Sequence, residues 1–198
     1  MAEVKVLVKG EHKRTEDGKL RIYSSVSLIK TDKNIIVDTG SFHETELIIK
    51  GLKEENLTPE DMDIVFLTHL HLDHVINTHL FKNAKIYCKF NPGYPGQIHN
   101  PKDGTIERTE INDGVKLTKD VEFLLTPGHT TDSTSLIVTT QDGKVCIAGD
   151  AFPSKEFLNL NKEPLAMLVD ISQFNKSRDK ILAIADYIIP GHGDIFKV

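Results

Sequence analysis

The feature that most constrains this chain is the segment T-H-L-H-L-D-H at residues 68–74, which holds three histidines and an aspartate. It follows the apolar run Ile64–Leu67, a pattern typical of a buried strand. Imidazole nitrogens and carboxylate oxygens are the ligands that borderline divalent metals such as zinc prefer. A strand that ends in this segment therefore predicts a metal site at the edge of a sheet.

Histidine-rich tracts also occur as solvated loops or as incidental surface metal binders. A solvated loop has no need of Asp73 between histidines, and further donors occur downstream at His129, Asp150 and His192. Each of the three follows an apolar run and lies beside glycine or proline, which is typical of a strand that ends in a tight turn. Five histidines and two aspartates therefore form the candidate ligand set.

These residues resemble the metallo-β-lactamase superfamily. Its five motifs occur here in order, as Asp38 in V-D-T-G, the H-x-H-x-D-H block, His129, Asp150 and His192. Within that superfamily, the Pro/Gly-rich residues 91–96 and the ending at residues 185–193 are most similar to the branch called metallo-beta-lactamase domain-containing protein one. The resemblance implies one metal held by His69, His71 and His129, a second held by Asp73, His74 and His192, and Asp150 as the bridge between them.

The predicted catalytic carboxylates are Asp73 and Asp150. Asp38 is either a turn carboxylate that caps backbone amides or an outer partner of a ligand histidine, and we favour the outer partner. His79 lies five positions beyond His74 along a predicted helix and is not expected to be a ligand. Phe152, two residues after Asp150, is predicted to lie at the rim of a substrate pocket.

The predicted fold is α/β (α+β), a four-layer αββα sandwich of two mixed β-sheets with helices outside, formed by a single domain at residues 1–198. The fold and the position of the metals at one sheet edge are what the family resemblance implies. Apolar periodicity predicts strands at 4–8, 20–29, 33–37, 64–67, 84–88, 144–148 and 187–189, further strands within 111–140, and helices at 44–57, 73–81 and 172–185. Residues 91–104, with Tyr94 and His99, are predicted to be a loop, interpreted as a lid with rim residues or as plain surface.

The composition is that of an ordinary globular protein, with a formal net charge of −5 that argues against a broad nucleic-acid-binding face. No stretch has the apolar length of a membrane span, and the first residues alternate polar and apolar like a strand, not like a secretory signal. A cytoplasmic protein is therefore expected, with Cys88 and Cys146 as buried thiols. A homodimer is a further expectation.

The seven ligands predict a hydrolase with two divalent metal ions, Zn²⁺ in the first place and Fe or Mn as alternatives, that uses a metal-bridging hydroxide. Its substrate is a small molecule or RNA, cleaved at an ester, lactone, thioester or phosphodiester bond. One alternative is a mononuclear iron enzyme that oxidises persulfides, with His71, His129 and Asp150 around the iron. Another is a metal-binding domain without catalysis.

Overall fold

The computed structural model describes residues 1–89, 111–159 and 168–198. Its first sheet has five strands in the order β1-β4-β5-β6-β7. The strands are β1 (Glu3–Val8), β4 (Val26–Lys30), β5 (Asn34–Val37), β6 (Ile64–Phe66) and β7 (Lys85–Tyr87). The sheet is mixed, because β1, β4 and β5 pair antiparallel while β5, β6 and β7 pair parallel.

The second sheet has six strands in the order β13-β12-β11-β10-β9-β8. They are β8 (Lys116–Thr118), β9 (Val121–Leu125), β10 (Thr134–Thr140), β11 (Gly143–Gly149), β12 (Tyr187–Pro190) and β13 (Phe196–Lys197). Among these six described strands, only β11 and β12 pair parallel. Both sheets are therefore mixed, as predicted.

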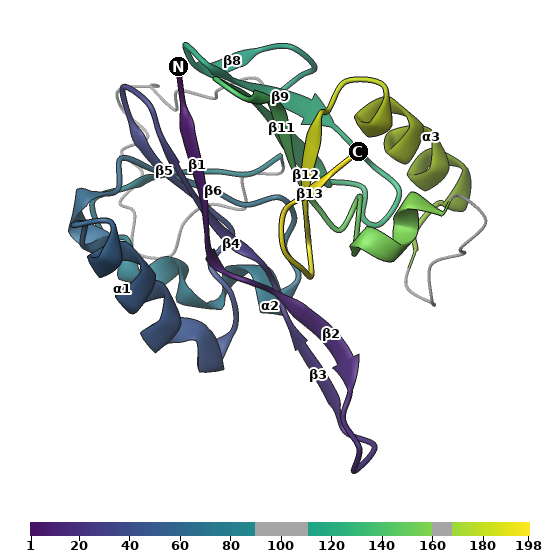
Figure 1. Cartoon of the computed structure of the whole chain (residues 1–198), viewed down its shortest axis with the longest axis horizontal. Coiled ribbons are helices and arrows are strands. Elements are labelled where there is room, and N and C mark those ends of the chain that lie inside the picture. Colours follow the sequence, from purple (N-terminus) through teal and green to yellow (C-terminus); the bar gives the residue numbers. More distant parts are fainter. Residues whose placement is uncertain (90–110, 160–167) are drawn as a thin grey trace, which may run out of the picture.

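Alternation along the strands builds the layers. Ile29 and Phe66 of the first sheet pack against Phe123 and Ile147 of the second, so one core lies between the sheets. Neighbouring positions point the other way, because successive side chains of a strand lie on opposite faces. On that outer face the first sheet meets α1 (Thr45–Glu54), and the second meets α3 (Ile171–Leu182). The result is the predicted four-layer αββα arrangement, with α1 and α3 on opposite sides (Figure 1).

The helix predicted at residues 73–81 was wrong in its form. The segment is divided into α2 (Leu72–Val75) and a 3₁₀ helix, η3 (Ile76–Leu80). The carbonyl of His74 accepts a hydrogen bond from the backbone N–H of Thr39 at 2.7 Å, and the N–H of Ile76 donates to the carbonyl of Gly40 at 3.1 Å. These bonds replace the i to i−4 ladder, so the α-helix stops after one turn.

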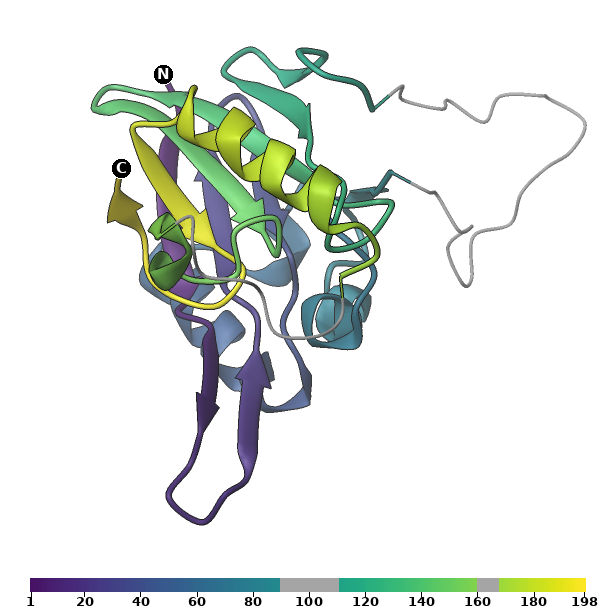
Figure 2. The same cartoon turned by 90° about the vertical axis from the view of Figure 1, so that its right-hand side faces the viewer.

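The single strand predicted at residues 20–29 was also wrong. It is broken at Ser24 and Ser25 into β3 (Leu20–Tyr23) and β4, and β3 pairs antiparallel with β2 (Glu11–Arg14), which was not predicted. We call the β2–β3 hairpin the arm. It extends beyond the sandwich in both views (Figures 1 and 2).

Short 3₁₀ helices complete the described parts of the chain. They are η1 (Phe42–Glu44), η2 (Pro59–Asp61) and η4 (Lys155–Leu158). Cys88 and Cys146 are buried in different apolar clusters, as predicted. Within the described residues no helix combines the length and apolar character that crossing a bilayer requires.

Candidate metal centre

Strand ends bring the ligands to one edge of the sandwich. β5 and β6 run parallel, and so do β11 and β12, so the carboxyl ends of each pair lie together. Asp38 follows β5, the histidine cluster follows β6, Asp150 follows β11 and His192 follows β12. His129 joins them from the turn between β9 and β10. Motifs that are far apart in the sequence thus lie together at a single place in the fold.

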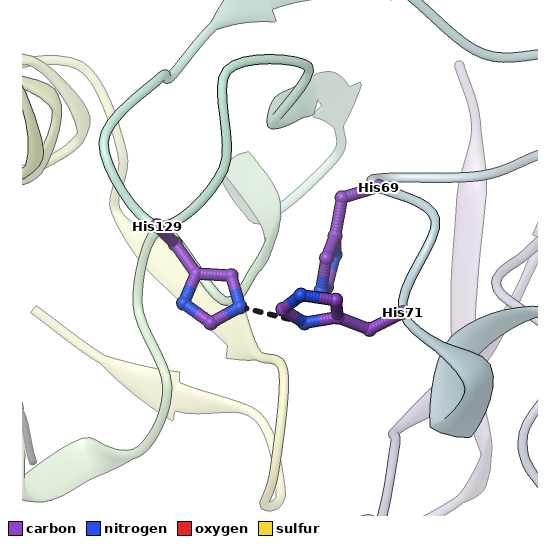
Figure 3. Close-up of side chains that lie close together, drawn as sticks. All are labelled: His69, His71 and His129. Carbon is purple, nitrogen blue, oxygen red and sulfur yellow. Dashed lines mark hydrogen bonds between the residues drawn. The ribbon is translucent and has the colours of Figure 1, made fainter. Parts of the chain in front are cut away.

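Six of the seven predicted ligands form two adjoining groups. The first contains His69, His71 and His129, and the second contains Asp73, His74 and His192; in each group the ligand atoms lie within 4.8 Å of one another. Figure 3 shows the three imidazoles of the first group turned toward one another. Nε2 of His129 lies 3.0 Å from Nδ1 of His71. We call the two groups the first and second ligand groups.

Asp150 lies between the two ligand groups. One carboxylate oxygen, Oδ2, is 3.3 Å from Nε2 of His129, and the other, Oδ1, is 3.4 Å from Nε2 of His74. Oδ1 is also 3.3 Å from Nε2 of His192. One carboxylate therefore reaches histidines of both groups, which is the position that a bridging ligand requires.

Three ligand histidines have their tautomer fixed by the protein. Nδ1 of His74 lies 2.8 Å from Oδ2 of Asp38, and Nδ1 of His192 lies 2.9 Å from the carbonyl oxygen of Tyr23. Since a carboxylate and a carbonyl only accept, both Nδ1 atoms carry the hydrogen. In the neutral form of both rings the lone pair is then on Nε2, the atom that faces the centre.

His69 reaches the same state through Thr68. The Thr68 hydroxyl lies 2.8 Å from Oδ2 of Asp38 and donates its single hydrogen there. It can only accept from Nδ1 of His69, 3.1 Å away, so the lone pair of His69 is also on Nε2. Asp38 additionally accepts from the backbone N–H of Thr68 at 2.8 Å. Asp38, placed as the outer partner we predicted, thus orients His74 directly and His69 through Thr68.

The atoms left over fit divalent metals. Nε2 of His69, Nε2 of His74 and Oδ1 of Asp150 are buried and have no hydrogen-bond partner among the described residues. A buried polar atom without a partner costs free energy, about 1–3 kcal/mol each. A cation that accepts these lone pairs removes that cost, and nitrogen and carboxylate donors of this kind suit zinc.

Burial and charge act in opposite directions on the ionisable groups. Burial disfavours the ionised form of Asp150, but the fields of His192 and His74 outweigh it and hold the pKa of that carboxyl well below its usual range. Burial lowers the pKa of His69 well below its ordinary value, and the neighbouring His74 acts in the same direction. The first ligand group thus has a neutral His69, the form that binds metals.

His74 is different. Burial also acts to lower its pKa, but the carboxylates of Asp38 and Asp150 outweigh burial and raise the pKa well above its ordinary value. Without a cation, the protonated form of His74 is therefore the favoured one near neutral pH. Because an imidazole must be unprotonated to ligate through Nε2, metal binding at the second ligand group is coupled to proton release.

Other predicted site residues lie elsewhere. Phe152 was wrongly placed at a pocket rim: its side chain is fully buried, and its ring packs 5.8 Å from that of Phe196 in the core beneath α3. The turn after β11 directs the carboxylate of Asp150 to the centre and the Phe152 ring inward. His79 is exposed and its Nδ1 lies 3.1 Å from the carbonyl of Ile76. Tyr94, His99 and the predicted lid at 91–104 lie outside the described residues.

Two neighbours of the centre were missed by the sequence. Thr68, immediately before the histidines, joins His69 to Asp38. His12, from β2 of the arm, has its ring 5.6 Å from that of His192 in an edge-on contact. The only signal for His12 was an isolated histidine in the polar stretch E-H-K-R, which does not predict a contact with residue 192.

Comparison with known proteins decides the family, since residues 21–192 match the family described as Metallo-beta-lactamase superfamily. The chain belongs to the metallo-beta-lactamase superfamily. It is 33% identical to Metallo-beta-lactamase domain-containing protein 1 of Xenopus laevis, over 98% of this chain and 81% of that one. It is 37% identical to a Methanocaldococcus jannaschii protein named Probable metallo-hydrolase, over 82% and 73% of the two chains.

The fold agrees with solved members of the superfamily. A variant of Bacillus thuringiensis AiiA with N-decanoyl-L-homoserine bound at its active site superposes with a TM-score of 0.69 at 20% identity, over 96% of this chain and 92% of that one. The branch predicted from the sequence is confirmed by the Xenopus relative. Membership of the superfamily and its metallo-hydrolase relatives identify this chain as a metal-dependent hydrolase.

Proposed function

We propose that the chain is a binuclear zinc hydrolase that cleaves a carboxylic ester or lactone. The observation that carries the proposal is the pair of adjoining ligand groups with Asp150 between them. His69, His71 and His129 would hold one cation, and Asp73, His74 and His192 would hold the other. Asp150 would contribute to both.

When bound, a pair of such cations supplies a water of lowered pKa and polarises the oxygen of the bond to be cleaved. The chain's own residues prepare that place. Asp38 and Thr68 fix His74 and His69 with Nε2 toward the centre, and the Tyr23 carbonyl does the same for His192. The ionised Asp150 supplies negative charge between the groups. Asp73, whose side chain is 25% exposed, is the ligand carboxylate most open to an arriving substrate.

The surface beside the ligands favours an ester or lactone over RNA. The two residues between the ligands of the H-x-H-x-D-H block, Leu70 and Leu72, have exposed fractions of 37% and 72%. They offer apolar contact at the place where a nucleic acid needs lysine or arginine near its phosphates. The overall charge of −5 points the same way. The similar AiiA structure contains an acyl-homoserine at its active site, which agrees with this substrate class.

The experiment is hydrolysis by protein of known metal content. Apoprotein is loaded with zinc, its metal content is measured by plasma mass spectrometry, and it is assayed with p-nitrophenyl butyrate, an acyl lactone, a thioester, a β-lactam and an RNA. We expect about two zinc ions per chain and the highest kcat/KM on the ester or lactone. Preference for RNA would move the substrate class to phosphodiesters, whereas one tightly held iron with oxygen consumption would overturn the hydrolase.

The mononuclear iron alternative uses only His71, His129 and Asp150. It leaves His69, His74 and His192 without a role, although their Nε2 atoms face the same centre. The binuclear proposal uses all seven side chains. A cytoplasmic location, a single domain and a homodimer stay predictions.

A further inference from the structure

The base of the arm is joined to the loop that carries His192. The backbone N–H of Ser25 donates to the carbonyl of Gly191 at 2.7 Å, and the Ser25 hydroxyl donates to the carbonyl of Gly193 at 2.8 Å. The same hydroxyl accepts from the backbone N–H groups of Gly193 and Gly10, at 3.1 and 3.3 Å. Ser25 therefore bonds the base of the arm, at both of its strands, to the loop that carries His192.

Gly10 shows how close this contact is. A Cβ atom at that position would lie 2.4 Å from the backbone nitrogen of Ser25, a distance that no side chain tolerates. Tyr23, at the end of β3, uses its carbonyl to fix Nδ1 of His192 at 2.9 Å. The position of the arm is thus coupled to the second ligand group.

The arm carries His12 to that group. Its ring lies 5.6 Å from the ring of His192 at an interplanar angle of 64°. The side chain is exposed, and its ring makes no hydrogen bond to another residue of the described ranges 1–89, 111–159 and 168–198. The arm therefore holds an exposed imidazole beside the centre.

Three of the five ligand histidines cannot offer a comparable donor. The Nδ1–H groups of His69, His74 and His192 already donate to Thr68, Asp38 and Tyr23, and in the neutral form that binds a metal their Nε2 atoms carry lone pairs that face the centre. An imidazole has at least one N–H in either protonation state. His12 is thus a hydrogen-bond donor beside three histidines whose N–H groups are committed.

Resting on the proposed function, we propose that His12 touches the substrate and donates a hydrogen bond to one of its oxygens on the side of the second ligand group. The arm is then part of the active site. The rival interpretation is that His12 only packs against His192 and keeps that ligand in place. The two differ in what happens to metal content and in what an amide side chain can replace.

The strand register supplies a matched control. His12 pairs with Ile22 and Lys13 pairs with Arg21 across the arm. Since neighbouring residues of a strand face opposite sides, Lys13 lies on the face away from His12. Lys13→Ala therefore changes the same strand of the arm without changing the face that meets the centre.

The test compares zinc-loaded wild type, His12→Ala, His12→Asn, His12→Gln and Lys13→Ala. We expect His12→Ala to keep its zinc and to lose roughly 10- to 100-fold in kcat/KM on p-nitrophenyl butyrate. This loss is smaller than that for an oxyanion-hole donor, because His12 contacts the reacting oxygens less directly. Asn and Gln place an amide N–H near the positions of Nδ1 and Nε2, so one of them should recover most of the rate. Lys13→Ala should match the wild type.

Two results would overturn the role of His12. Loss of zinc from His12→Ala would make it a packing residue, and a kcat/KM within about twofold of the wild type would remove it from the site. Titration calorimetry with butyrate, the product carboxylate, separates this from failure of the proposed function. If the wild type hydrolyses none of the esters, weaker binding of butyrate to His12→Ala still supports the contact, and equal binding rejects it.

Discussion

Oδ2 of Asp38 lies 2.8 Å from Nδ1 of His74, and both side chains are buried. The same carboxylate oxygen accepts from the hydroxyl of Thr68. Asp38 has a positive φ of 56°, a conformation that Asp and Asn tolerate better than other side chains. The substitution Asp38→Asn therefore removes the negative charge of the side chain without adding backbone strain.

Asp38→Asn is expected to lower the affinity of the second ligand group for zinc. The amide has one acceptor oxygen for three donors, so it cannot serve both Thr68 and His74 as the carboxylate does. Loss of such an outer partner costs about 10- to 100-fold in metal affinity. Competition with a chromophoric chelator measures the change, with Asp142→Asn in an exposed turn as the control. An unchanged zinc affinity would remove Asp38 from the centre.

His71→Ala and His79→Ala separate ligand from bystander. Nδ1 of His71 lies 3.0 Å from Nε2 of His129, whereas His79 is exposed and bonded to its own helix. We expect His71→Ala to lose about one zinc per chain, because three ligands at a catalytic site leave none to spare, and to abolish turnover. His79→Ala should keep the metal content of the wild type. Loss of a full equivalent from His79→Ala would contradict the ligand assignment.

Gly191→Ala is expected to displace Asp150 without removing any ligand. A Cβ atom at residue 191 would lie 1.8 Å from Oδ1 of Asp150, so the carboxylate must move away from His74 and His192. Zinc content after dialysis and kcat/KM should both fall, by roughly 10-fold or more. Equal zinc retention by Gly191→Ala and the wild type would show that the carboxylate need not occupy this position.

Gly114→Ala is the control for that change. Gly114 has a φ of 73°, and no described atom lies within 4 Å of the position that an alanine Cβ would take there, so only backbone strain is added. We expect a loss of about 1 kcal/mol in the free energy of unfolding with zinc content unchanged. A similar fall in zinc content for Gly114→Ala would mean that glycine substitution acts through general destabilisation.

The candidate ligands lie together in the structure as the sequence predicted, because their positions depend on strand ends. Residues such as Asp150 and His192 follow apolar runs directly, and parallel pairing of β11 and β12 brings them to one edge. Superfamily resemblance supplied the division into two groups. The strand-end pattern and the resemblance both concern histidines and aspartates, whose metal-binding chemistry follows from the residue type alone.

The parts that were not predicted depend on contacts distant in the sequence. The helix after Asp73 stops because Thr39 takes the carbonyl of His74, and no local pattern indicates that bond. β2 has no buried residue to set an alternation, so its pairing and the place of His12 were not predicted. Phe152 was predicted at the pocket rim because it is close to Asp150 in the sequence, but the turn between them directs the two side chains to opposite sides.

Arg178 of α3 is a buried cation that joins the helix to η4. Its side chain is almost fully buried, and Nη2 donates to the carbonyl of Phe157 at 2.6 Å. The guanidinium carbon lies 5.7 Å from the ring centroids of both Phe157 and Phe174, and 6.0 Å from that of Phe152. Among the described residues, Arg178 is therefore stabilised by cation–π contact and hydrogen bonding and not by a carboxylate partner.

Arg178→Met is expected to lower the free energy of unfolding by about 2–4 kcal/mol, because it leaves the Phe157 carbonyl without this donor and removes the cation from between the rings. Lys176→Met, at an exposed position of the same helix, should change it by less than about 0.5 kcal/mol. Urea unfolding followed by circular dichroism measures both. Since Arg178 lies in the core beneath α3 and not at the metal edge, zinc affinity of the folded variant should equal that of the wild type. Equal stability of the two variants would show that packing of the aliphatic stem, which methionine keeps, is the whole contribution of Arg178.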